Sequence, residues 1–370
     1  MESRRGKVVV AMSGGVDSSV AAAILLREGY EVVGVFMRLG SAQGAESADA
    51  CEPGGRQGCC SVMDAADARR VAGVLGIPLY VLNFQDDFDR VIDYFVAEYN
   101  RGRTPNPCVR CNDWLKFGKL ARYAQAIGAE YVASGHYARM GEDPVTGRRT
   151  LMRGRDHRKD QSYVLFGMKP EVAKHTLLPI GEFEKPQVRA MAREWKLPVH
   201  DKPDSQEICF VPDQDYAALV RHLSPQAFSP GMIVDTQGQA VGRHEGHQHF
   251  TIGQRRGVRL ALGHPVYVVG IDPEKNQVTV GEKQALMKTR LTARQVNWIG
   301  DRVSRAGGTM RCSAKIRYNH APQPAVVRIT GEDEFEVIFD EPVSAITPGQ
   351  AVVLYDGDVV LGGGWIERAP

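Results

Sequence analysis

Apolar runs and amphipathic segments alternate through the first part of the chain. Four short runs rich in β-branched residues predict strands, and the segments between them have the apolar spacing of helices. The predicted strands are Lys7–Met12, Glu31–Phe36, Leu79–Asn83 and Tyr131–Ser134, and the predicted helices are Asp17–Arg27, Val62–Leu75, Asp86–Asn100 and Asp113–Ile127. Glycines 29, 76 and 128 follow three of these helices, where a left-handed cap is expected. The alternation predicts a parallel α/β sheet with helices on both faces.

The pattern changes after about residue 210. Short β-like runs separated by Gly-, Pro- and Asp-rich turns take over, which is typical of small β domains or barrels. These runs are Val266–Ile271, Gln277–Gly281, Ala325–Ile329, Glu334–Phe339 and Ala351–Tyr355. We therefore expect three domains: an α/β domain over 1–212, a small central β-rich domain over 213–285 and a C-terminal β-barrel over 286–370.

Composition restricts the class of protein. A chain of 370 residues fits two or three domains. The net charge of +2 does not indicate a nucleic-acid binder, so any RNA-binding surface must be local. The sequence shows no signal peptide and no apolar run of membrane length, which predicts a cytoplasmic protein. Seven cysteines in clusters indicate reactive thiols or metal ligands better than a disulfide framework.

A Gly-Gly turn joins the first predicted strand to the first predicted helix. The turn is Ser13-Gly-Gly-Val-Asp-Ser18. Backbone amides in such a turn, at a helix N-terminus, favour an anion, so we expect the turn to hold a phosphate group. It has neither the Gly-Lys-Ser/Thr ending of a Walker loop nor the spacing of the dinucleotide fingerprint. Ser13, Met37 and Gly135-His136 follow three different strands, and we expect them to meet in one crevice.

The cysteines suggest a second kind of chemistry. Cys108 and Cys111 lie in a Pro-stiffened turn before a helix, where a thiol has a lowered pKa, and Cys209 stands far along the chain. From the residues alone three alternatives stay open: a zinc half-site, an iron–sulfur cluster on the three thiols, and nucleophilic sulfur chemistry. Cysteines 51, 59, 60 and 312 are interpreted as plain loop or core thiols.

Two further clusters are candidates for binding. Six basic residues gather within a dozen positions, against a single acid, Asp156, and such a run can bind RNA phosphates or remain solvated surface. The six are Arg148, Arg149, Arg153, Arg155, Arg158 and Lys159. The stretch His244–His249 lacks the spacing of a helical zinc site, and we interpret it as surface.

Several motifs occur together and in a fixed order along nearly the whole chain. They are Ser13–Ser18, Gly102–Pro107, Cys111-Asn112, Gly135–Arg139, Lys159–Ser162, Asp204–Phe210, Thr251–Gly257 and Pro348–Gln350. The first resembles the PP-loop of ATP pyrophosphatases, and the whole set resembles the bacterial tRNA-specific 2-thiouridylase family. The resemblance implies a PP-loop domain, a small central domain and a C-terminal β-barrel. It also implies synthesis of 2-thiouridine at the wobble uridine, U34, of tRNA.

The resemblance also implies roles for single residues. ATP, with Mg²⁺, would be bound by Ala11, Met12, Ser13, Gly14, Gly15, Val16, Asp17, Ser18, Met37 and Gly135. Asn106, Pro107 and Cys108 would contact the target base, and His136, Lys159, Asp160, Gln161, Arg317, Tyr318 and Gln350 would contact the tRNA. Cys209 would receive a persulfide from a cysteine desulfurase or sulfur-relay protein, and Cys111 would be the nucleophile that releases its sulfur.

Alternatives to this mechanism stay open. Some members of the family have Asp at the position of Cys108, so the extra thiol here strengthens the case for a [4Fe-4S] cluster on Cys108, Cys111 and Cys209. More distant alternatives are a PP-loop synthetase that acts on a small molecule and a non-catalytic RNA-binding protein.

Overall fold

A five-stranded parallel sheet forms the centre of the N-terminal half. The computed structural model describes residues 5–40, 62–204, 208–211, 215–300 and 307–369. The sheet order is β3-β2-β1-β4-β7. Its strands are β1 (Lys7–Ala11), β2 (Glu31–Arg38), β3 (Leu79–Asn83), β4 (Tyr131–Ser134) and β7 (Thr176–Leu177). The four strands expected from the sequence are confirmed, whereas β7 has too few residues to show a pattern.

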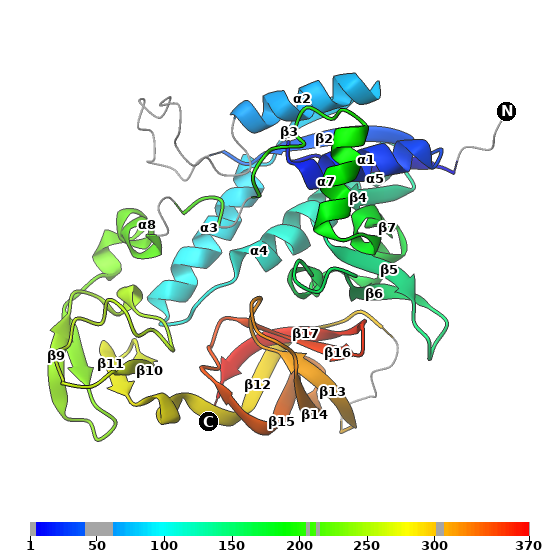
Figure 1. Ribbon diagram of the computed structural model, residues 1–370. Coiled ribbons are helices and arrows are strands. Elements are labelled where there is room, and N and C mark those ends of the chain that lie inside the picture. Colours follow the sequence, from blue (N-terminus) through cyan, green and yellow to red (C-terminus); the bar gives the residue numbers. More distant parts are fainter. Residues whose placement is uncertain (1–4, 41–61, 205–207, 212–214, 301–306, 370) are drawn as a thin grey trace.

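Helices cover both faces of this sheet, as Figure 1 shows. They include α1 (Val16–Arg27), α2 (Val62–Leu75), α3 (Gln85–Asn100), α5 (Leu120–Ala126), α6 (Pro170–Lys174) and α7 (Lys185–Glu194). Side chains of β1 alternate between the faces. Val8 and Val10 pack with α1, α2 and α7, whereas Val9 and Ala11 pack in a second cluster with α3. Glycines 29, 76 and 128 have φ values of 86°, 67° and 71°, which confirms the predicted left-handed caps.

The helix that carries the Cys-x-x-Cys pair begins earlier than expected and is irregular. It consists of α4 (Pro107–Arg110), a π-helical stretch (Cys111–Lys119) and α5 (Leu120–Ala126). Asn106 caps it, because its side-chain oxygen accepts a hydrogen bond from the Val109 amide at 3.3 Å. The prediction of a start at Asp113 was wrong because the Asn-Pro pair is itself the helix start signal. π-helical turns are rare and often mark functional sites.

The rest of the chain is built mainly from β-strands. After α8 (Tyr216–Leu223), a four-stranded sheet has the order β10-β11-β8-β9. Its strands are β8 (Gly231–Val234), β9 (Ala240–His244), β10 (Tyr267–Asp272) and β11 (Gln277–Gly281). Six further strands close into a barrel, because the first of them pairs with both its neighbour and the last. They are β12 (Met287–Trp298), β13 (Thr309–Lys315), β14 (Gln323–Gly331), β15 (Glu334–Ser344), β16 (Ala351–Asp356) and β17 (Val359–Arg368).

A hairpin from the N-terminal half extends the barrel sheet. It comprises β5 (Ala138–Glu142) and β6 (Arg149–Arg153), and β6 pairs with β17 through Val359 and Met152. Figure 1 shows the hairpin between the parallel sheet and the barrel. One apolar cluster contains Val9 of β1, Phe95 of α3 and Trp365 of β17, so the two domains share a core.

Arg110 fastens the Cys-x-x-Cys helix to the barrel. Its guanidinium lies over the rings of Tyr94, Trp114 and Trp365, at 5.1, 5.2 and 4.0 Å from their centroids. Burial lowers the pKa of Arg110, and the surrounding aromatic faces replace part of its hydration. The side chain therefore holds the helix against β17.

We expect Trp365→Ala to destabilise this arrangement strongly. The substitution removes a buried ring from the shared core and one face of the Arg110 site, at a cost of about 3–5 kcal/mol. Thermal unfolding of the two variants Trp365→Ala and Trp365→Phe measures the effect. Trp365→Phe keeps an aromatic face, so its melting temperature should fall clearly less than that of Trp365→Ala. Equal melting temperatures for wild type and Trp365→Ala would contradict the shared core.

Candidate active site

The Gly-Gly turn leaves the N-terminus of α1 open to a ligand. Gly15 is the N-cap of α1, and within the described part of the chain it provides no side-chain hydrogen bond to cap the helix. The Ser18 hydroxyl accepts a hydrogen bond from the Ser13 amide at 3.1 Å, which closes the turn from within. Gly14 has a φ of 72°, a conformation that favours glycine. The uncapped amides of the first helical turn are the groups that bind anions in such a position.

Two glycines allow very close packing around the turn. A Cβ atom on Gly14 would lie 2.2 Å from the Asp64 carbonyl oxygen, and a Cβ on Gly135 would lie 2.4 Å from the Ser18 amide nitrogen. The ends of β1 and β4 therefore meet at the first turn of α1. Met37, at the end of β2, is buried in the apolar cluster that also contains Ala11.

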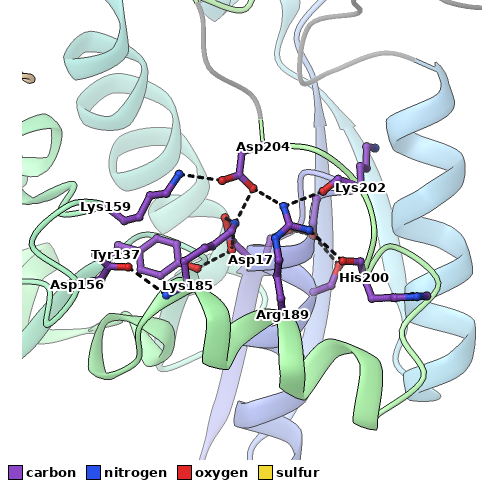
Figure 2. Close-up of polar contacts among 12 residues, drawn as sticks. Asp17, Tyr137, Asp156, Lys159, Lys185, Arg189, His200, Lys202 and Asp204 are labelled. Carbon is purple, nitrogen blue, oxygen red and sulfur yellow. Dashed lines mark hydrogen bonds and ion pairs between the residues drawn. The ribbon is translucent and has the colours of Figure 1, made fainter.

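A buried lysine neutralises the carboxylate of the phosphate turn. Lys185, the first residue of α7, donates hydrogen bonds to both oxygens of Asp17, at 2.8 and 2.9 Å. The Tyr137 hydroxyl donates to the same carboxylate at 2.8 Å. Burial, followed by the Asp17 charge, raises the pKa of Tyr137, so the phenol keeps its proton and remains a donor. Figure 2 shows this group of side chains.

Asp204 extends the network toward the motif that contains Cys209. Its carboxylate contacts Lys185 at 2.7 Å, Arg189 at 2.8 Å and Lys159 at 2.9 Å (Figure 2). Burial alone would raise the pKa of Asp204, but the hydrogen bonds from Lys185 and Lys159 outweigh it and hold the pKa at about 2. Three cations thus surround two carboxylates, which leaves a positive excess beside the open helix N-terminus.

A second lysine holds the back of the turn. The Lys202 ammonium donates to the Gly14 carbonyl at 3.1 Å and to Asp64 and Asp67 at 2.6 Å each. Burial would lower the pKa of Lys202, but these two carboxylates raise it. Because Lys202 engages the Gly14 carbonyl, the peptide of Gly14 is anchored to α2.

Sequence reasoning missed Lys185, Arg189 and Lys202 as parts of the site. They lie more than 160 residues after Ser18 in the sequence. A lysine at the start of a predicted helix looks like a solvated residue, since only the fold brings it to the turn. Lys185 is in fact buried. The one sequence signal for this network was Asp204, the acid that begins the motif Asp204–Phe210.

The three candidate thiols lie in two segments of the same domain. Cys108 is exposed, whereas Cys111 and Cys209 are half-buried and pack against one apolar cluster. Phe210 fixes the Cys209 segment there, with its ring 5.5 Å from that of Phe88 and 5.2 Å from that of Phe95. Among the described residues, no three His, Cys, Asp or Glu side chains are grouped to hold a metal ion.

Of the remaining cysteines, only Cys312 lies among the described residues. Cys312 is buried in the barrel, and burial raises the pKa of its thiol to about 12, as expected for a core residue. Cysteines 51, 59 and 60 lie outside the described residues.

Most of the expected tRNA-contacting residues make internal hydrogen bonds. Gln161 accepts from the Tyr137 amide at 2.9 Å, and Asp160 accepts from the Gly154 and Ser162 amides. Gln350 donates to the carbonyls of Thr104 and Pro105, which positions the loop before Asn106 and Pro107. Arg317 donates to the Thr347 hydroxyl at 2.7 Å, whereas Tyr318 is 38% exposed.

His136 is buried and neutral. Its Nδ1 lies 2.7 Å from the Ser134 hydroxyl and its Nε2 lies 3.4 Å from the Lys116 ammonium. An ammonium can only donate, so Nε2 accepts and the proton is on Nδ1. Burial and the nearby Lys116 charge lower the pKa of His136 well below its ordinary value of 6.5.

The basic run is less available than its sequence indicates. Arg153, Arg155 and Lys159 contact the carboxylates of Asp160, Glu182 and Asp204. Two of these acids come from segments outside the run.

The interpretation of His244–His249 as surface was wrong. His244 and His247 are buried, and His247 Nε2 lies 3.2 Å from the Asn100 carbonyl at the end of α3. His247 thus joins the central domain to the N-terminal domain, whereas His244 bonds to the Asn276 carbonyl within the central domain.

Comparison with known proteins settles the family. A model described as the tRNA methyl transferase HUP domain matches residues 6–213, one described as the tRNA methyl transferase PRC-barrel domain matches 218–282, and one described as the aminomethyltransferase beta-barrel domain matches 288–366. The tRNA-specific 2-thiouridylase MnmA of Carboxydothermus hydrogenoformans is 50% identical over 369 residues, 98% of each chain. That of Clostridioides difficile is 47% identical over 364 residues, again 98% of each.

The chain belongs to the tRNA-specific 2-thiouridylase family. The expected order of an α/β domain, a central domain and a C-terminal barrel agrees with this family's domain models. Among the described residues, no helix has the length and hydropathy needed to cross a membrane.

Replacing Lys185 should weaken ATP binding. Lys185→Met leaves the Asp17 carboxylate without its buried cation beside the phosphates. A lost charge-assisted hydrogen bond of about 1.5–3 kcal/mol corresponds to a roughly 10- to 100-fold higher Kd. Calorimetric titration with ATP measures this, with the exposed Lys174→Met as control. Asp17→Asn in the Lys185→Met background should recover part of the affinity for ATP. An unchanged Kd in Lys185→Met would show that Lys185 does not contribute to ATP binding.

His136 should make stability depend on pH. Its folded pKa lies below the unfolded value, so the unfolded chain binds the extra proton as the pH falls through about 6.5. Wild type should therefore lose stability below that pH, by up to ~1.4 kcal/mol per pH unit from this group. The urea concentration at the midpoint of unfolding, measured across the titration range of histidine, should have a smaller slope against pH in His136→Gln than in wild type. His157→Gln, at an exposed histidine, should keep the wild-type slope; identical slopes in all three proteins would mean that His136 is not buried neutral.

Proposed function

We propose that this protein catalyses ATP-dependent 2-thiolation of U34 in tRNA, giving 2-thiouridine, AMP and pyrophosphate. The observation that carries the proposal is the near-complete match to 2-thiouridylases, in a chain whose phosphate turn is open and flanked by the buried cation Lys185. The activity is that of a tRNA-uridine 2-sulfurtransferase.

ATP would bind with its phosphates on the turn Ser13–Ser18. The α1 amides would receive the phosphate oxygens, and Lys185 would offset the charge that they share with Asp17. Gly135 packs directly against Ser18, where a Cβ atom would clash with the backbone of α1, so the end of β4 borders the phosphate turn. Mg²⁺ bound together with ATP would offset the charge on the phosphates.

The first chemical step would activate the base. Uracil O2 attacks the α-phosphorus with loss of the N3 proton, the bond to the β-phosphate oxygen breaks, and pyrophosphate leaves. Asn106, Pro107 and Cys108 would hold the base, on a loop that Gln350 fixes through two backbone carbonyls. The adenylated O2 is then a good leaving group on C2, and it can leave as AMP.

The second step would transfer sulfur. The terminal sulfur of a persulfide on Cys209 attacks C2, and AMP leaves. The Cys111 thiolate then attacks Sγ of Cys209, so the sulfur–sulfur bond breaks, 2-thiouridine departs and a Cys111–Cys209 disulfide forms. A reductant supplying two electrons restores both thiols. A cysteine desulfurase or sulfur-relay protein would supply the persulfide sulfur.

The persulfide mechanism is favoured over the iron–sulfur alternative. A cluster would need Cys108 as its third thiol ligand, and Cys108 is exposed whereas Cys111 and Cys209 are half-buried. The persulfide mechanism needs only Cys111 and Cys209, which pack against one apolar cluster. No feature of the site favours a small-molecule synthetase or a non-catalytic RNA-binding protein.

The cysteine variants test this assignment. Cys111→Ser and Cys209→Ser should lower the yield of thiolated tRNA by at least roughly 10³-fold, because each lacks an obligatory sulfur. Both should still release up to one equivalent of pyrophosphate with ATP and tRNA, since adenylation precedes sulfur transfer.

Cys108→Ala provides the matched control, and it should keep most of the activity. Thiolation is measured by mass spectrometry of digested tRNA, with a persulfide donor and with air excluded or admitted. Loss of activity in Cys108→Ala, together with activity only in iron-loaded anaerobic enzyme, would overturn the persulfide assignment. Wild-type yields from Cys209→Ser would overturn the role of that thiol.

A further inference from the structure

Lys116 lies on the same π-helical stretch as the candidate nucleophile Cys111. A π-helix bonds each residue to the fifth residue along the chain, so Cys111 and Lys116 are neighbours on one side of it, one turn apart. In a regular α-helix these two positions would face different sides, because there the residues three and four apart are the ones that share a face. The π-helical turn therefore places Lys116 on the side of the helix that carries Cys111.

The ammonium of Lys116 lies at the carboxyl end of β4. It is 3.4 Å from Nε2 of His136, whose Nδ1 is 2.7 Å from the Ser134 hydroxyl. Ser134 ends β4 and is the register partner of Ala11, which ends β1. The loops after these two neighbouring strands thus leave the sheet side by side, and the loop after β1 is the phosphate turn. Ligands of parallel sheets bind beyond such strand ends.

Gly135 shows how close this position is to the first turn of α1. A Cβ atom on Gly135 would lie 2.4 Å from the Ser18 amide nitrogen. His136 is the next residue, and its buried ring meets the ammonium of Lys116. A side chain that starts on the helix of Cys111 therefore ends beside the phosphate turn.

The charge of Lys116 is not balanced in the way that the other lysine charges at the turn are. Lys185 and Lys202 each contact two carboxylates. Among the described residues, Lys116 instead meets the neutral imidazole of His136 and has no carboxylate within ion-pair distance. A positive charge that the protein leaves unbalanced beside an anion-binding turn is available to a phosphate oxygen.

We propose that Lys116 is a further catalytic residue, whose ammonium contacts the α-phosphate of bound ATP. The inference rests on the proposed function. The α-phosphate is bonded first to pyrophosphate, which the α1 amides would hold, and then to uracil O2, beside the carbon that the persulfide sulfur attacks. It must therefore lie between the phosphate turn and the thiols, and Lys116 joins these two places.

Lys116 keeps its proton through both chemical steps. In the first step, the bond from O2 to the α-phosphorus forms while the bond to the β-phosphate oxygen breaks, and pyrophosphate takes the electron pair. In the second step, the carbon–sulfur bond forms and the bond from C2 to O2 breaks, so AMP leaves with O2 and its electron pair. An ammonium on a non-bridging oxygen of the α-phosphate stabilises the negative charge in both transition states.

Ligand binding tests the assignment without the reaction. Lys116→Met should raise the Kd of AMP roughly 10- to 100-fold, the effect of one lost charge-assisted hydrogen bond. The Kd of adenosine, which has no phosphate, and that of inorganic pyrophosphate should stay as in wild type. Calorimetric titration measures all three. Lys119→Met, on the same π-helical stretch, should match wild type for each ligand, because the ammonium of Lys119 pairs with Asp87. An equal Kd of AMP in wild type and Lys116→Met would overturn the proposal.

Two further variants keep this test decisive if Lys116→Met is unstable. Lys116→Arg keeps the charge and should retain most of the affinity for AMP. Lys116→Gln loses the charge but can still donate a hydrogen bond to His136, so it should fold like wild type and bind AMP as weakly as Lys116→Met. Wild-type affinity of Lys116→Gln for AMP would overturn the proposal. So would a lowered melting temperature of Lys116→Met with an unchanged Kd of AMP, since Lys116 would then only support His136.

Turnover separates this inference from the proposed function. Lys116→Met should lower the kcat of thiolation by about 10²- to 10³-fold, as for the loss of one donor to a developing negative charge. If wild type thiolates tRNA and Lys116→Met does so at the same rate, only the assignment of Lys116 fails. If wild type binds AMP through Lys116 but does not thiolate tRNA, the proposed function fails and the phosphate contact stands.

Discussion

A carboxylate at a phosphate-binding turn has to be neutralised before the turn can accept ATP. Two like charges about 4 Å apart repel each other by about 4 kcal/mol at the effective dielectric constant of a protein surface. Asp17 stands in the first turn of α1, where the phosphates would lie. Lys185 meets both of its oxygens from the start of α7, so the chemistry of the turn depends on a helix that is distant in the sequence.

The same ion pairs connect the parts of the reaction. Lys185 also contacts Asp204, and Asp204 in turn contacts Lys159, which belongs to a motif expected to contact tRNA. The nucleotide turn, the motif that contains Cys209 and the hairpin region thus share one network of charges (Figure 2). The hairpin β5–β6 is itself part of the barrel sheet, so the barrel is tied to the active-site domain by backbone pairing and by the shared core.

What the sequence predicts well is local. The turn Ser13–Ser18 and its flanking strand and helix follow from signals within about twenty residues, and the strands β3 and β4 have the predicted bounds. What it does not predict depends on contacts between distant segments. Lys185 looks like a surface lysine until α7 packs on α1. Likewise β6 finds its partner β17 some two hundred residues later, and Arg110 finds its third ring on that same strand. The resemblance named the cysteines and the RNA-contacting residues, but only the fold shows that several of them have internal partners.

The central claim is that ATP activates O2 of the target uridine before sulfur replaces it. Labelling that oxygen with ¹⁸O in the substrate RNA and analysing the products by mass spectrometry tests this directly. If O2 attacks the α-phosphorus and AMP later leaves C2, the label must appear in AMP, in an amount equal to the 2-thiouridine formed. Unlabelled AMP alongside thiolated RNA would contradict the account.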